Sequence, residues 1–172
     1  MMKYLNGIVS IVVGASMYLL GLLPYISTTG TLVGKSNTQN YTFYNMLSSN
    51  LDIATAYKVF AIIMMVVAGL LILGGLAELL KQANILKVKT NIATINSIIL
   101  VALVLSLVGL LISSFVVASN VTGSLVEGYP VIASSSTNVT FGEYIAIAVS
   151  IVGLILSLMT TKTTKKSSKK RK

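Results

Sequence analysis

The stretch IATINSIILVALVLSLVGLLISSFVVA, residues 92–118, contains no charged residue. An α-helix rises about 1.5 Å per residue, so about 20 apolar residues cross the hydrocarbon core of a bilayer. This stretch is long enough to cross as one helix. Three further predominantly apolar runs lie at 5–26, 57–80 and 144–161. The sequence therefore predicts an all-α membrane protein with four spans.

The composition of the whole chain agrees with this interpretation. Of the 172 residues, 55% are hydrophobic and 10% are charged, and the mean hydropathy is +0.88. A soluble domain has about 25% charged residues, so this chain needs lipid around it. The absence of Cys and His excludes thiolate catalysis, disulfides, Cys/His zinc sites and His-dependent triads. We expect no catalytic residue, no cofactor, no metal site and no enzymatic activity.

The basic residues divide unequally between the two sides of the predicted membrane. Of the 13 Lys and Arg residues, all except Lys35 and Lys58 fall at the N-terminus, in the connection 81–91 or in the tail 162–172. Basic residues are retained in the cytoplasm. We therefore expect a cell-membrane protein with both termini in the cytoplasm. The loops 27–56 and 119–143 would then lie outside.

A strongly basic tail follows the fourth predicted span. Its charges are Lys162, Lys165, Lys166, Lys169, Lys170, Arg171 and Lys172. Each basic residue near an anionic leaflet contributes about 1 kcal/mol of attraction. We expect the tail to contact anionic lipid headgroups. Nucleic acid is not an expected partner, because the tail has no aromatic side chain on which bases could stack.

Three sequons provide glycosylation candidates. They are at Asn40, Asn120 and Asn138, and all three lie in the predicted outer loops. N-glycosylation requires that side of the membrane, although loops rich in Asn, Ser and Thr also produce such triplets by chance.

Small residues recur along one face of each predicted span. The candidate packing residues are Gly7, Gly14 and Gly21; Ala61, Ala68 and Gly75; Ala102, Ser106, Gly109 and Ser113; and Ala146, Ser150, Gly153 and Ser157. Small residues allow helices to approach closely in lipid. Rows that repeat every seven residues, or that alternate steps of four and three residues, predict an antiparallel, left-handed four-helix transmembrane bundle. The identical rows of the last two spans are explained by duplication or by convergence on packing.

The predicted spans contain few polar residues that could form a transport or catalytic site. Glu78 has Lys81 three residues later, which predicts an interfacial ion pair rather than a transport site. Glu143 starts the fourth span, where the helix dipole favours an acid. Asn96 is expected to form a hydrogen bond between helices.

The outer loops contain runs that are typical of strands and turns. These runs are Thr29–Val33 and Tyr41–Tyr44 in the first loop, and Tyr129–Ala133 followed by Ser134–Asn138 in the second. We expect them to pair into a small antiparallel extracellular sheet. The alternative is a pair of flexible, glycosylated loops.

The layout resembles the claudin and peripheral-myelin-protein group of four-span proteins. Leu23-Pro24-Tyr25 is similar to the Pro-containing end of their first span, and Phe141-Gly142-Glu143-Tyr144 to the Phe-Gly pair that opens their fourth. The Trp and paired Cys of their first-loop signature are absent, with only Tyr41, Phe43 and Tyr44 near that region. No paracellular pore or barrier role therefore carries over.

These observations favour a non-enzymatic membrane protein with a structural or adhesive role. It would assemble laterally with itself or with another membrane protein through its outer loops. The alternative is a small accessory subunit of a larger respiratory or transport complex. Channel formation by an oligomer is a third hypothesis.

Overall fold

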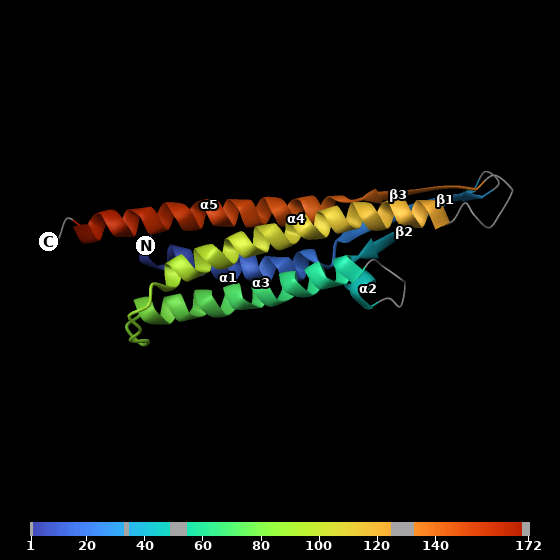
Figure 1. The fold of residues 1–172 in the computed structure, drawn as a ribbon. Coiled ribbons are helices and arrows are strands. Elements are labelled where there is room, and N and C mark those ends of the chain that lie inside the picture. The colour runs from blue at the N-terminus through green and yellow to red at the C-terminus, as the bar shows by residue number, and fades with distance from the viewer. Residues whose placement is uncertain (1, 33–34, 49–54, 125–132, 170–172) are drawn as a thin grey trace.

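Long helices dominate the computed structural model, which describes residues 2–32, 35–48, 55–124 and 133–169. The long helices of this part are α1 (Met2–Leu20), α3 (Thr55–Gln82), α4 (Ile92–Ser124) and α5 (Phe141–Lys169). They lie side by side (Figure 1). Both termini and the turn after α3 lie at one end, and the short helix α2 (Phe43–Ser48) and a small sheet lie at the other.

The long helices surround a common core. Helix α1 packs against α3 and α5, and α4 packs against the same two helices. Aliphatic and Met side chains from the helices fill the space between them, including Val13, Met17, Met64, Leu71 and Leu107. This arrangement places α1 diagonally opposite α4.

The outer faces of the helices are also apolar. In the most apolar 18-residue segment of α3, the mean hydropathy is 2.8, but only 33% of the segment is buried inside the protein. Leu, Ile and Val side chains therefore cover the exterior, among them Val12, Leu73, Ile98, Leu105 and Ile155. Such a surface is stable in lipid and not in water.

Within the described residues, three helices are long and apolar enough to span a membrane. They are α3, α4 over Ile92–Val116 and α5 over Phe141–Thr160. The apolar part of α1, Tyr4–Leu20, is shorter. The prediction of an integral membrane protein is consistent with these lengths.

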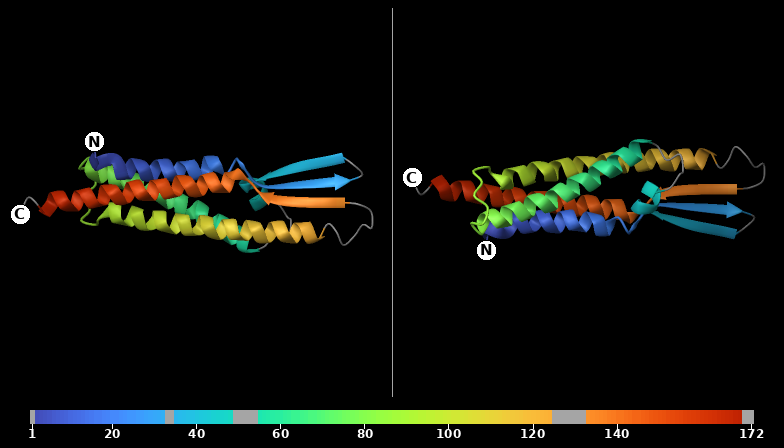
Figure 2. Two further views of the ribbon diagram at one scale, coloured as in Figure 1. Left: turned by 90° about the horizontal axis from the view of Figure 1, so that it is seen from above. Right: turned by 90° about the horizontal axis from the view of Figure 1, so that it is seen from below.

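A three-stranded antiparallel sheet extends beyond α1, α3 and the start of α5, with the C-terminal part of α4 alongside it (Figure 2). Its strands are β1 (Pro24–Leu32), β2 (Lys35–Thr42) and β3 (Ala133–Val139), in the order β2-β1-β3. Thr29 of β1 is paired with Thr38 of β2 on one side and with Ser136 of β3 on the other. The expected pairing of the two loops into a small sheet is confirmed.

The first predicted span was too long at its C-terminal end. Helix α1 ends at Leu20 rather than at residue 26. The amides of Leu22 and Leu23 bond to carbonyls three residues back, which tightens the last turn. Pro24 has no amide hydrogen to continue the helix and instead begins β1.

Two helices continue beyond the predicted spans, into segments that look polar. The apolar part of α4 is Ile92–Val116, close to the predicted span 92–118, but the helix runs on to Ser124 and contacts β3. Phe43 and Tyr44 belong to α2 and not to a strand. The tail is helical to Lys169, since extending a helix needs no new nucleation. Residues 129–132 of the second loop lie outside the described part.

Candidate functional site

Small residues bring α1 and α3 into close contact. A Cβ atom added to Gly75 would lie 2.6 Å from the backbone oxygen of Gly7, and one added to Gly14 would lie 2.7 Å from that of Ala68. Ala61 and Ala68 are fully buried on α3. A larger side chain at Gly14 or Gly75 would therefore force the two backbones apart.

The packing candidates at both ends of α1 also have close neighbours. A Cβ atom on Gly7 would lie 3.0 Å from the Gly75 backbone oxygen. A Cβ atom on Gly21 would meet the ring of Tyr44 at 2.9 Å. The glycines of α1 thus contact α3 along the helix and α2 beyond its C-terminus.

The packing candidates of α4 are divided between the core and the surface. Ser106 and Ser113 are buried, and each hydroxyl donates to a carbonyl one turn earlier in α4. A Cβ atom on Gly109 would overlap the ring of Phe60. Ala102 is exposed, so its assignment to the seam was wrong. It lies at the edge of a buried face centred on leucines such as Leu103.

The packing candidates of α5 face the other helices. Ala146, Ser150 and Ser157 are fully buried. A Cβ atom on Gly153 would overlap the side chain of Val13 in α1. This row therefore forms the contact of α5 with α1.

A polar cluster joins all four long helices near the termini. We call it the turn-end cluster, and it consists of Asn6 (α1), Glu78 (α3), Asn96 (α4) and Ser157 (α5). One carboxylate oxygen of Glu78 accepts hydrogen bonds from the side-chain amides of Asn6 and Asn96, both at 3.0 Å. Ser157 donates to the Asn6 side-chain oxygen at 2.6 Å and lies 2.8 Å from the Ser97 hydroxyl. Each of the four cluster side chains is at most 3% exposed.

The turn-end cluster replaces the ion pair predicted for Glu78. Among the described residues, no ion pair joins Glu78 to Lys81. The Lys81 ammonium donates instead to the backbone oxygen of Thr90. Glu78 faces the core, where two amide donors are available to it, whereas Lys81 reaches the following turn. The interhelical hydrogen bond expected of Asn96 is confirmed.

A second cluster lies where the helices meet the sheet. We call it the sheet-end cluster, and it consists of Glu143 (α5), Ser114 (α4), Tyr25 (β1) and Tyr57 (α3). Their side chains are at most 1% exposed. The Ser114 hydroxyl donates to Oε1 of Glu143, while Oε2 of Glu143 and both tyrosine hydroxyls have no hydrogen-bond partner among the residues that the structure describes. Each unsatisfied buried polar atom costs about 1–3 kcal/mol, so this arrangement requires an explanation.

Aromatic rings and backbone contacts fix the sheet-end cluster. The rings of Tyr25 and Phe43 lie 5.7 Å apart. The Thr140 amide donates to the Tyr25 carbonyl at 2.9 Å, which connects the root of β1 to the start of α5. Burial raises the pKa of Tyr25 above its ordinary value of 10.0, and the charge of Glu143 and then Tyr44 add to the rise. Glu143 thus occupies the predicted first turn of α5 but is also buried.

The glycosylation candidates lie at the sheet end of the molecule. Asn40 and Asn138 are exposed and both pair with Ser27 of the central strand, one from each side. Asn120 lies in the last turns of α4 and not in the loop that was predicted for it.

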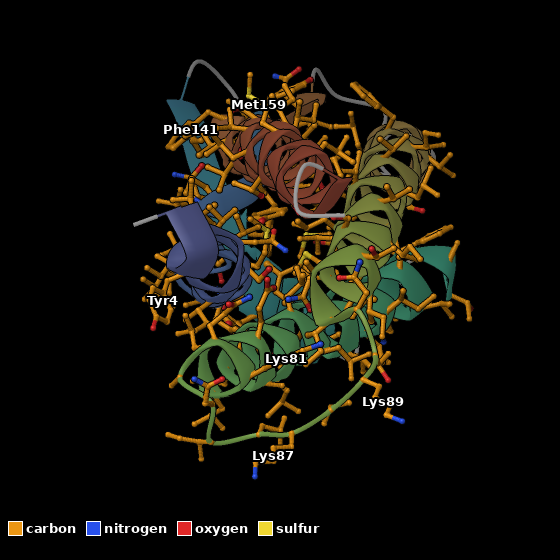
Figure 3. The ribbon with its side chains drawn as sticks, turned by 90° about the vertical axis from the view of Figure 1, so that its left-hand side faces the viewer. Tyr4, Lys81, Lys87, Lys89, Phe141 and Met159 are labelled. Carbon is orange, nitrogen blue, oxygen red and sulfur yellow. The ribbon has the colours of Figure 1, made fainter. Side chains whose placement is uncertain are left out.

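Basic residues lie at the opposite end. Figure 3 shows Lys87 and Lys89 pointing away from the helices, beyond Lys81. The backbone of α5 carries Lys162, Lys165, Lys166 and Lys169 past the other helices. Lys170, Arg171 and Lys172 of the predicted lipid contact lie outside the described residues. The two ends of the molecule therefore differ strongly in charge.

The described residues contain no group of three or more His, Cys, Asp or Glu side chains that could hold a metal ion. No family model, no curated protein and no solved structure matches the chain. The likeness to claudins and peripheral myelin proteins therefore has no support beyond the layout.

Sequence reasoning missed Asn6, Ser114, Tyr25 and Tyr57 as members of the two clusters. Asn6 was detectable as an amide inside an apolar run, because polar groups at membrane depth need partners. Tyr25 and Tyr57 gave no such signal, since tyrosine is common at the ends of membrane helices.

Proposed function

We propose that this chain is a non-enzymatic cell-membrane protein that crosses the bilayer four times, as an antiparallel, left-handed bundle with cytoplasmic termini. Helix α1 would cross the membrane in addition to α3, α4 and α5. Its apolar part is short, but α1 packs against α3 and α5, and close glycine contacts hold it against α3. The basic tail would lie on anionic lipid headgroups.

The proposed role is structural or adhesive, through lateral assembly of copies by their outer sheets. The observation that carries this proposal is the strand order β2-β1-β3, which leaves β2 at an edge. Thr38, Gln39 and Asn40 of β2 are exposed. An open strand edge offers backbone donors and acceptors to a second strand. The claudin-like layout, with its sheet above a bundle, and glycans at Asn40 and Asn138 are compatible with this role.

Crosslinking in native membranes tests the proposal. The chain has no Cys, so Gln39→Cys places a single thiol on β2 without altering a sequon. A short bifunctional maleimide should trap a homodimer of this variant. The matched control is Lys87→Cys, which is exposed at the opposite end and should give no dimer.

The outcome also distinguishes lateral assembly from the alternative role as an accessory subunit. A strictly monomeric Gln39→Cys variant would contradict lateral assembly. Recovery of the protein from mild detergent in a stoichiometric respiratory or transport complex would instead support the accessory-subunit role.

A further inference from the structure

The sheet-end cluster gathers oxygen atoms from separate parts of the chain. Glu143 comes from α5, Ser114 from α4, Tyr25 from β1 and Tyr57 from α3. All four side chains are completely or almost completely buried. The Tyr25 ring lies beside Gly142, the residue before Glu143, because a Cβ atom added there would lie 3.0 Å from it. Phe60, one turn after Tyr57, lies against Gly109 of α4, about one turn before Ser114, so that the start of α3 is at the level of the Ser114–Glu143 contact.

Three oxygen atoms of this cluster lack a hydrogen-bond partner among the described residues. Ser114 donates to Oε1 of Glu143, and the other carboxylate oxygen and the two phenol oxygens have no partner within the described part of the chain. Buried polar atoms are almost always satisfied by protein, ordered water or an ion. Three such atoms from three different elements therefore point to a common ligand.

The charge of Glu143 is also incompletely balanced. Within the described part of the chain, no Lys or Arg forms an ion pair with it. The N-terminus of α5 contributes the equivalent of about half a positive charge. A water molecule would satisfy the hydrogen bonds, whereas neutralising a buried carboxylate takes a proton or a cation.

We propose that the sheet-end cluster binds one small monovalent cation, such as Na⁺, through Oε2 of Glu143 and the hydroxyl oxygens of Tyr25 and Tyr57. Hard cations prefer oxygen ligands of this type. A single carboxylate balances a single positive charge, which favours an alkali ion over a divalent ion. The ligands connect β1, α3 and α5, so the ion would hold the sheet against the helices.

Thermal unfolding of the purified full-length protein in detergent tests this proposal. NaCl or KCl is exchanged for choline chloride at constant ionic strength and pH, because choline is too large for the cluster. The unfolding temperature should rise saturably with Na⁺ or K⁺, since a ligand that binds only the folded state stabilises it. Equal unfolding temperatures in all three salts would overturn the proposal.

Glu143→Gln removes the charge and retains the size of the side chain, so the response to alkali ions should disappear. Tyr57→Phe should weaken the apparent affinity about tenfold or more. Glu78→Gln, at the other buried acid, and Tyr144→Phe, at an exposed tyrosine, are matched controls that should keep the full response. A response retained by Glu143→Gln would contradict the assignment.

Two further measurements keep the test decisive. If Glu143→Gln does not fold, radioactive Na⁺ binding to the wild-type protein and to Tyr57→Phe provides the comparison, and absence of binding to the wild type overturns the proposal. A stability that depends on pH but does not distinguish Na⁺, K⁺ and choline would show that the group carries a proton and not a cation.

Discussion

At the scale of single residues, Glu78 shows how a buried acid is accommodated among apolar helices. Its carboxylate receives two amide hydrogen bonds, from Asn6 and Asn96. Hydrogen bonds to a charged acceptor are stronger than those between neutral groups. The acid therefore links α1 and α4 to α3, and Ser157 adds α5 through Asn6.

Replacing Glu78 should reveal this linkage. Glu78→Leu leaves the two amides without their acceptor and should lower the free energy of unfolding by about 1–3 kcal/mol. Glu78→Gln retains an acceptor oxygen and should lower it less. Lys87→Ala, at an exposed position in the turn outside the cluster, should change it by less than about 0.5 kcal/mol. Unfolding in mixed detergent micelles measures the three values, and equal losses for Leu and Gln would contradict the network.

At the scale of elements, the sheet is held to the helices at its root. Thr140 donates from its amide and its hydroxyl to the carbonyls of Tyr25 and Pro24. The ring of Phe43 packs on Tyr25. An isolated pair of strands is marginally stable in water, and these contacts provide the missing support.

The strand register can be tested with introduced thiols, since the chain has no Cys. The hydroxyls of Thr29 and Thr38 lie 3.1 Å apart across β1 and β2. The double variant Thr29→Cys/Thr38→Cys should therefore form an intramolecular disulfide on mild oxidation, detected as a mobility shift that reductant reverses. Thr29→Cys/Gln39→Cys places the second thiol on the opposite face and should stay reduced. The reverse result would show a register shifted by one residue.

At the scale of the whole molecule, most of the basic residues and the strands occupy opposite ends. The termini and the connection after α3 lie together, and the sheet lies at the far end (Figure 1). Apolar side chains cover the helices between them. The proposed orientation, with the basic end in the cytoplasm, rests on this separation.

Labelling of single thiols in sealed vesicles tests this orientation. Asn138→Cys lies on β3 and Lys87→Cys in the turn after α3, and both positions are exposed. An impermeant maleimide should label Asn138→Cys from the outside of right-side-out vesicles and Lys87→Cys only after the vesicles are opened. Labelling of both from the same side would contradict an odd number of crossings between them.

Apolar length and composition made the helical class, the approximate helices and the small sheet predictable. Boundaries were less accurate, because an apolar run such as 5–26 does not show that Pro24 already begins a strand. The rows of small residues identified close contacts, such as Gly7 with Gly75. Ala102 followed the same spacing and is exposed.

The sequence by itself determined that lipid must surround the chain and that Cys and His chemistry is excluded, since both follow from composition. Only the tertiary structure decided that Glu78 meets two amides and that Glu143 meets Ser114 near two tyrosine hydroxyls that have no partner among the described residues. The physical reason is distance along the chain. Residues on different helices come together only through packing, and no local pattern records which polar groups the closed core will bring into contact.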